Sequence, residues 1–263
     1  MNKTDLKKQV IDNISMITHE VKTPVNLIYS TAKIADMRIR SDSISQNDLE
    51  KYFQNIINNC NKINLMLNNI MSINSINKSD YELIDINYFA KEFSKCLAEF
   101  EEVYNFKFNL DTETEIEKIN IPVNTTERIL LNLINNAVKY NSKTSKIISL
   151  KIYDKDDFLY FSVKDNGDGI SEENLPRITE KFFRASNTSV GGIGLGLSMV
   201  KDLVSEMGGE LKITSKLKKG TEVTFSVPVN NKDRMFMLKS NDFDYIPSKS
   251  YFAIELATLN TNE

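Results

Sequence analysis

The feature that most constrains the fold is an apolar seam in the first third of the chain. Apolar residues recur at steps of three and four through residues 10–39 and again through residues 49–73. This spacing places them along one face of a helix. It predicts two long helices, over about 6–40 and 48–77, joined by a polar segment that offers Asn47 as an N-cap.

Two helices with matched seams predict an antiparallel hairpin. Alone, the hairpin leaves apolar surface in water, although burying one large apolar side chain contributes about 1.5–3 kcal/mol. Pairing two hairpins into a four-helix bundle buries that surface. We therefore expect a homodimer through residues 6–77. The alternative is a monomeric hairpin that folds onto the rest of the chain.

His19 is the only histidine among the 263 residues. It lies off the seam, so its imidazole should face water, with Glu20 directly after it and Thr23 one helical turn on. Pro24 has no N–H for the carbonyl of Glu20, so the helix should bend beside His19. An exposed imidazole next to a carboxylate suits a nucleophile with a proton acceptor, whereas the alternative is an ordinary core histidine.

The nine glycines all lie between Gly167 and Gly220. Glycine serves backbone with positive φ or close to a ligand, so the glycine-free part predicts helices and plain strands and the later part a special loop. Beyond residue 80, helices and mostly hairpin-joined strands favour an α+β two-layer sandwich. The expected strands are 81–86, 106–110, 117–121, 146–153, 158–164, 210–215 and 222–229, and the expected helices are 87–102, 125–140 (N-cap Asn124) and 195–207.

The change of period divides the chain into a hairpin (1–78), a second domain (79–229) and a C-terminal tail (230–263) with no role indicated. The net charge of −3 and the absence of a basic run argue against nucleic-acid binding. No apolar run approaches the roughly 18 residues of a membrane span. Cys60 and Cys96 are expected to be buried free thiols of a reducing compartment.

The segment NLINNAVKY places Asn132 and Asn136 on one face of the expected helix, with Lys139 and Tyr140 within a turn. Asparagine is a poor helix former, so two in register suggest a polar task. Amide oxygens, a lysine and an aromatic ring suit a hydrated divalent cation, phosphates and a base. Solvated asparagines on an exposed face are the alternative.

Three further segments follow. DNGDG (165–169) ends a strand, and Asp165 there could accept a hydrogen bond from an exocyclic amine, although Asn-Gly and Asp-Gly also form simple turns. Lys181 and Arg184 flank two phenylalanines as a candidate phosphate clamp. GGIGLGL (191–197) leads into a helix and would offer backbone N–H groups to phosphate.

In this order the motifs resemble the catalytic core of sensor histidine kinases of two-component systems, over about residues 6–229. HEVKTP (19–24) resembles the phospho-acceptor box, NLINNAVKY the N box, DNGDG the first glycine box, EKFFRAS (180–186) the lid box and GGIGLGL the second glycine box. The resemblance implies a HisKA-type dimerisation and phosphotransfer hairpin, then a GHKL (Bergerat) ATP-binding domain.

The resemblance also implies roles for single residues. His19 would take the γ-phosphoryl group, Glu20 the other ring proton, and Thr23 would position water for dephosphorylating a response regulator. Asn136 would bind Mg²⁺, with Asn132 supporting phosphates or metal-bound water. The ATP contacts it implies are Asn132, Asn136, Lys139, Tyr140, Asp165, Gly167, Gly169, Arg184, Gly192, Gly194, Leu195, Gly196 and Thr221, with Asp165 on the adenine amine and a mobile lid over 166–194.

The sequence departs from the family's pattern at three places. Ile178 stands where an aromatic is frequent and Lys181 where arginine is frequent, and the last glycine box is reduced to KKGT (218–221). These departures fall in the lid box and around Thr221.

The activity implied is ATP-dependent autophosphorylation of His19 with Mg²⁺, transfer to an aspartate of a response regulator receiver domain, and dephosphorylation of that regulator. The chain would be cytoplasmic, by itself or as the cytosolic part of a longer sensor protein. A phosphatase-biased protein or a silent dimeric scaffold that binds a regulator stays open. A superfamily ATPase fits less well, because it carries a glutamate base where this chain has Asn132, which cannot accept that proton.

Overall fold

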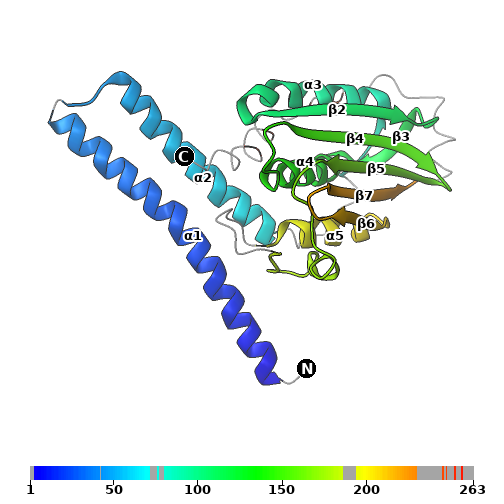
Figure 1. Cartoon of the computed structure of the whole chain (residues 1–263), viewed down its shortest axis with the longest axis horizontal. Helices are drawn as coiled ribbons and strands as arrows, with labels where there is room; N and C mark the ends of the chain where they lie inside the picture. The colour runs from blue at the N-terminus through cyan, green and yellow to red at the C-terminus, as the bar shows by residue number, and fades with distance from the viewer. Residues whose placement is uncertain are drawn as a thin grey trace.

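The computed structural model describes a helical hairpin followed by an α+β sandwich (Figure 1). The described residues are 3–41, 43–71, 76, 80–185, 194–229, 245, 247, 252 and 256. Among them, no helix is long and apolar enough to cross a membrane.

Helices α1 (Lys3–Arg40) and α2 (Gln46–Met71) run antiparallel as the hairpin (Figure 1). Helix α1 continues through Pro24, which is buried. The predicted cap Asn47 is wrong. The cap is Ser45, whose Oγ accepts from the N–H of Asp48 at 3.1 Å while the Asp48 carboxylate accepts from the N–H of Ser45 at 3.5 Å.

The predicted apolar seam divides between two surfaces of the hairpin. Some of its residues lie half-buried between the two helices: Ile17, Val21, Ile28, Ala35, Ile56 and Ile63. Others face outward, and Val25 (46%), Ile39 (53%), Phe53 (58%) and Leu67 (45%) are largely exposed. On α2 the outward stripe keeps a four–three spacing through Phe53, Ile57, Cys60, Asn64 and Leu67. The expected burial of Cys60 is therefore wrong, because its position faces outward, whereas Cys96 is buried as expected. One chain alone leaves this second apolar surface uncovered.

The sandwich contains one five-stranded sheet, in the order β2-β4-β5-β7-β6. Only the pair β2–β4 is parallel, and the other neighbours are antiparallel. Strand β1 pairs separately with β3. The strands are β1 (Tyr81–Asp85), β2 (Phe106–Glu113), β3 (Lys118–Pro122), β4 (Lys146–Lys155), β5 (Phe158–Asp165), β6 (Leu211–Lys216) and β7 (Gly220–Pro228). The strand segments predicted from the sequence are therefore all present, with ends shifted by a few residues.

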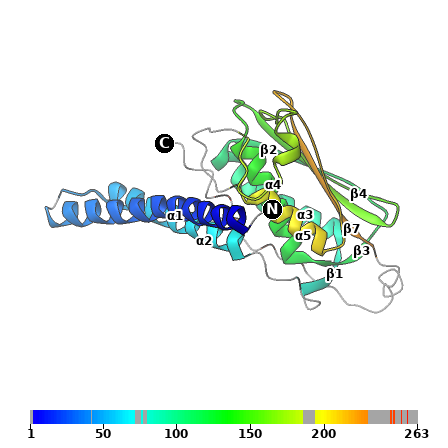
Figure 2. The ribbon, with the colours of Figure 1, turned by 90° about the horizontal axis from the view of Figure 1, so that it is seen from below.

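The second layer contains α3 (Ile86–Tyr104), α4 (Val123–Lys139) and α5 (Gly196–Glu206), with a short 3-10 turn at Leu175–Arg177. Figure 2 shows these helices on one face of the sheet. Alternate strand residues such as Leu150, Phe161 and Phe225 are fully buried against them. The predicted cap Asn124 is wrong, because α4 starts at Val123 directly after Pro122, with no side-chain cap.

Three described residues of the C-terminal tail belong to the core. Phe252 and Leu256 are 0% exposed and Tyr245 is 8% exposed. Phe252 packs on Phe93 of α3, with ring centroids 5.0 Å apart. The Tyr245 hydroxyl donates to the buried Glu127 carboxylate of α4 at 2.8 Å. The tail therefore contributes to the helical layer of the sandwich.

We predict that Phe252→Ala lowers the free energy of unfolding of the sandwich by about 3–5 kcal/mol, because it removes a fully buried ring from contact with Phe93. Urea unfolding followed by circular dichroism measures this change. Val103→Ala on α3 is the control, since Val103 is 61% exposed and its loss should change little. Equal stability of the two variants would show that the tail does not support the core.

Candidate functional site

The polar face of α4 carries Asn132 and Asn136. Asn132 is 6% exposed, and its Oδ1 accepts a hydrogen bond from Asn136 Nδ2 at 3.1 Å. Because Asn136 donates its N–H to Asn132, its own amide oxygen is not used in this bond and can serve as an acceptor. Gly196 at the start of α5 abuts this pair, and a Cβ there would come within 3.0 Å of Asn132 Oδ1. The two helices approach closely here because residue 196 has no side chain.

Asp165 is the last residue of β5, the middle strand of the sheet, and lies near the end of α4. Its Oδ1 accepts from the N–H groups of Gly167 at 2.7 Å and Thr221 at 3.2 Å. Burial raises the pKa of the Asp165 carboxyl, and these two backbone hydrogen bonds oppose that rise. Among the described residues no donor is bound to Oδ2, so that oxygen can accept a further hydrogen bond.

Lys139 is the last residue of α4 and lies where charged groups of both domains meet. Burial, together with the positive charge of Arg184, lowers its pKa from 10.5 to about 8. The Glu20 carboxylate of α1 opposes this shift, and Lys62 of α2 adds to it weakly. The Arg184 guanidinium and the Glu20 carboxylate of the hairpin therefore both lie within electrostatic range of Lys139.

The structure describes only part of the glycine-rich segments. Gly169 adopts φ +68° beside the backbone of Lys216, and Gly194 adopts φ +72°, where its carbonyl accepts from the N–H of Phe182 at 2.9 Å. Leu195 precedes α5 and is 9% exposed. Gly192 and most of the predicted lid residues near it lie outside the described residues. The predicted lid segment ends at Gly194, two residues before α5 begins at Gly196.

The candidate clamp residue Lys181 has another partner. Its Nζ lies 3.0 Å from the Asp202 carboxylate of α5. On the same side, Arg177 stacks over Phe183, 4.3 Å from the ring centroid, and pairs with Glu180. Of the two predicted clamp cations, Arg184 lies within electrostatic range of Lys139, whereas Lys181 pairs with Asp202 of α5.

His19 is exposed on α1, as expected from its place off the seam. The Thr23 hydroxyl donates to the carbonyl of His19 at 3.2 Å. Tyr140 is 43% exposed and lies under Lys139, whose Nζ is 5.5 Å from the ring centroid. The predicted residues therefore form two groups, one on the hairpin around His19 and one around the ends of α4, β5 and α5.

Sequence reasoning overlooked two asparagines. Asn141 is 4% exposed and donates to Asn166 Oδ1 at 2.8 Å, which joins the segment after α4 to the segment after β5. The signals available were Asn141 directly after the segment NLINNAVKY and the asparagine within DNGDG. A buried partner 25 positions away is not visible in a local pattern.

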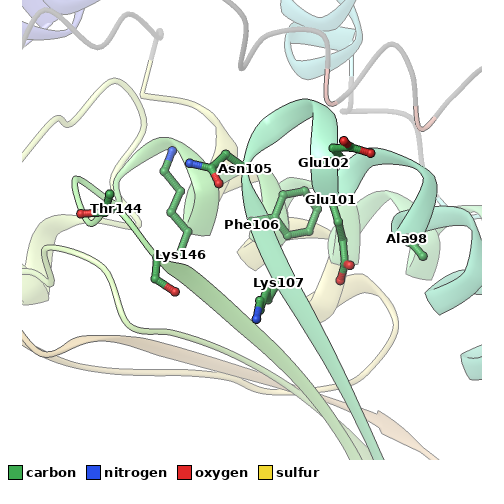
Figure 3. Close-up of a pocket in the computed structure, with 9 residues that line it drawn as sticks. Ala98, Glu101, Glu102, Asn105, Phe106, Lys107, Thr144 and Lys146 are labelled. Carbon is green, nitrogen blue, oxygen red and sulfur yellow. The ribbon is translucent and has the colours of Figure 1, made fainter.

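A separate open cavity of about 460 Å³ lies where α3 ends and β2 begins. Figure 3 shows Lys146, Thr144 and Asn105 on one side of it and Glu101 and Lys107 on the other. None of the residues predicted to bind nucleotide lines this cavity. Its lining mixes both charges, so it does not favour one ligand.

The residues present fit one Mg²⁺ held mainly by a nucleotide. No group of three acidic, histidine or cysteine side chains that could hold a metal occurs within the described residues. Mg²⁺ commonly takes one or two protein oxygens and completes its shell with phosphates and water. The amide oxygen of Asn136 could supply one such ligand.

Part of the chain matches a known protein family. Residues 123–231 match the family described as histidine kinase-, DNA gyrase B-, and HSP90-like ATPase. The aerobic respiration control sensor protein ArcB of Escherichia coli (strain K12) is 28% identical over 223 residues, which cover 81% of this chain and 28% of ArcB. Sensor histidine kinase YkoH of Bacillus subtilis (strain 168) is 28% identical over 233 residues, covering 86% of this chain and 49% of YkoH.

The chain thus spans 28% and 49% of the lengths of these two relatives. Among solved structures, histidine kinase ThkA in complex with response regulator protein TrrA superposes with a TM-score of 0.62 at 20% identity, over 88% of this chain and 65% of that chain. The chain therefore shares the fold of that kinase and resembles sensor histidine kinases.

We predict that ATP affinity falls as the pH rises through about 8, because Lys139 loses its charge there in the free protein. Its lowered pKa means that the ammonium is present below that pH and absent above it. Bound phosphate would favour the charged form, so binding above that pH should take up a proton. Calorimetry over a pH series in buffers of different ionisation enthalpy measures both effects.

Lys139→Arg is the matched variant, since guanidinium stays protonated throughout this range. Its ATP affinity should vary much less with pH. The same pH dependence in both proteins would exclude Lys139 as the titrating group.

Proposed function

We propose that this chain is an ATP-dependent protein-histidine kinase that phosphorylates its own His19 and passes the phosphoryl group to an aspartate of a response regulator. One observation carries the proposal: the same chain has an exposed histidine, His19, on its hairpin and a segment that matches an ATPase family. That segment contains the residues suited to bind a nucleotide. We place the hairpin domain at residues 1–78, the ATP-binding domain at 79–229 and the tail at 230–263.

ATP would bind along the line from β5 to α4. The Asp165 Oδ2 would accept the adenine amine, while its Oδ1 is held by two backbone N–H groups. Lys139 and Arg184 would neutralise the phosphates. The two cations lie close enough for Arg184 to lower the pKa of Lys139. Backbone N–H groups at the start of α5, where Gly196 meets Asn132, would face the phosphate chain.

Phosphoryl transfer would then be mainly a matter of position and charge neutralisation. An imidazole nitrogen of His19 attacks the γ-phosphorus, a P–N bond forms, and the P–O bond to ADP breaks. Glu20 accepts the proton of the other ring nitrogen. Mg²⁺, when bound through Asn136, would spread the charge of the phosphates. Thr23, whose hydroxyl is anchored on the His19 carbonyl, is the proposed residue for orienting water in regulator dephosphorylation.

A second proposal concerns assembly. The outward stripe of α2 leaves Phe53 (58%) and Ile57 (50%) in water. A second hairpin would cover this stripe in a four-helix bundle, which supports a homodimer through residues 6–77. Histidine kinase ThkA is known in complex with a response regulator protein, and a receiver domain is the partner we propose for the surface around His19.

We predict that incubation with γ-labelled ATP and Mg²⁺ places an acid-labile, alkali-stable label on the wild-type chain. His19→Gln should carry none, because its amide has no nucleophilic nitrogen to form the P–N bond. Label on that variant would refute the role of His19. Label absent from both proteins, with ATP binding intact, would favour the phosphatase-biased or scaffold alternative.

We predict that Asn136→Ala lowers the rate of phosphorylation from Mg·ATP at least about tenfold, because the amide oxygen proposed to bind the charged Mg²⁺ is lost. Its mass in light scattering should remain that of the dimer, because Asn136 lies in the other domain. If Asn136→Ala dissociates the dimer, our assignment of dimerisation to the hairpin and of ATP binding to the second domain is wrong.

We predict that Phe53→Glu converts the dimer to monomer, because a carboxylate would be buried without a partner in the apolar stripe. Light scattering measures the mass over a concentration series. Gln54→Glu adds the same charge at the neighbouring exposed position and should leave the dimer intact. A dimer in both variants would move the interface away from this stripe.

A further inference from the structure

Asn141 connects the end of the helix that would hold the phosphates to the strand end that would hold the base. We propose, building on the kinase function above, that Asn141 is a positioning residue that sets the Asp165 carboxylate for the exocyclic amine of ATP. It directly follows Tyr140, the C-cap of α4, and only 4% of it is exposed. Nothing in its position suggests contact with nucleotide, so its effect would act through its partners.

The Asn141 amide is bonded at both ends. Its Nδ2 donates to Asn166 Oδ1 at 2.8 Å, and its Oδ1 accepts from the N–H of Lys143 at 3.1 Å. Because a buried amide is costly to leave without partners, these two bonds select one orientation of the side chain. The Asn141 donor is thereby aimed at the residue next to Asp165.

Asn166 is held as firmly on its own side. Its Oδ1 also accepts from the N–H of Ile147 at 2.9 Å, its Nδ2 donates to the carbonyl of Ser145 at 3.0 Å, and its backbone N–H donates to the carbonyl of Ile147 at 3.2 Å. The segment from Asn141 to Ile147 therefore encloses the Asn166 side chain. Since Asn166 is bonded covalently to Asp165, this enclosure restrains the carboxylate from its C-terminal side.

Contacts around Gly167 also connect the turn after β5 to the residues that follow α4. The N–H of Asp168 donates to the carbonyl of Tyr140 at 3.1 Å, and a Cβ on Gly167 would lie 3.1 Å from Asn141 Cβ. The turn after β5 therefore rests on the residues that end α4. A nucleotide gripped by Asp165 at one end and by Asn136 and Lys139 at the other needs a constant span, and Asn141 would maintain it.

The test compares two ligands that differ only at the amine. The full chain is titrated with ATP and with purine riboside 5′-triphosphate, which lacks the 6-amino group. The wild type should bind ATP about tenfold more tightly than this analogue, as expected for one hydrogen bond to a charged group. Asn141→Asp keeps the acceptor for Lys143 but cannot donate to Asn166, so it should lose most of the preference for ATP while binding the analogue unchanged.

Ser142→Ala is the control in the same segment. Ser142 donates to the Asp168 carboxylate and does not touch Asn166, so this variant should keep the wild-type preference. Asn141→Ala carries the same expectation as Asn141→Asp and replaces it if the new carboxylate prevents folding. Thermal unfolding of each variant separates loss of fold from loss of preference.

The outcomes separate the two proposals. A wild type that binds both ligands equally overturns the contact between Asp165 and the amine, and with it the proposed nucleotide site. A wild type that prefers ATP, with Asn141 variants that prefer it equally or weaken both ligands alike, overturns only the positioning role. Loss of the preference in the Asn141 variants alone supports it.

Discussion

The burial of α4 against the sheet is the constraint on which the rest of the structure depends. Ile129, Leu130 and Ile134 are fully buried, and at about 25 cal/mol per Å² of apolar surface such a face gives the helix a single orientation. With that face fixed, Asn132 and Asn136 must lie on the side toward α5. The polar face is therefore positioned by the apolar one. Lys139 at the end of α4 and Asn141 just after it then lie near the C-terminal end of β5.

The hairpin shows how one apolar pattern can serve two contacts. A seam at steps of three and four covers a broad stripe of the helix surface, wider than one partner helix can bury. Ile56 and Ile63 lie within the hairpin, whereas Phe53 and Leu67 face outward. The same physical cause, removal of apolar surface from water, holds the two helices together and favours a second copy on the outer side.

Helices and strands could be predicted because their periods are local. Among the described residues, the strands of the sheet and the helices α1 to α5 lie where the sequence predicted them, since apolar alternation and helical spacing report directly on which face is buried. The two caps were predicted wrongly for different reasons. Ser45 competes with Asn47 through a reciprocal bond with Asp48, and β3 runs straight into α4 at Pro122, so that no cap is needed.

The sequence by itself determined the order of the elements, the two asparagines on one helix face, the exposed histidine and the glycine-rich segments, because each depends on neighbours within a few residues. Only the tertiary structure decided that Asn141 meets Asn166, that Tyr245 covers Glu127, and that Glu20 acts on Lys139. These pairs join residues far apart in sequence, and their contacts follow from how whole layers pack. Packing is a property of the assembled surfaces, and no local pattern encodes it.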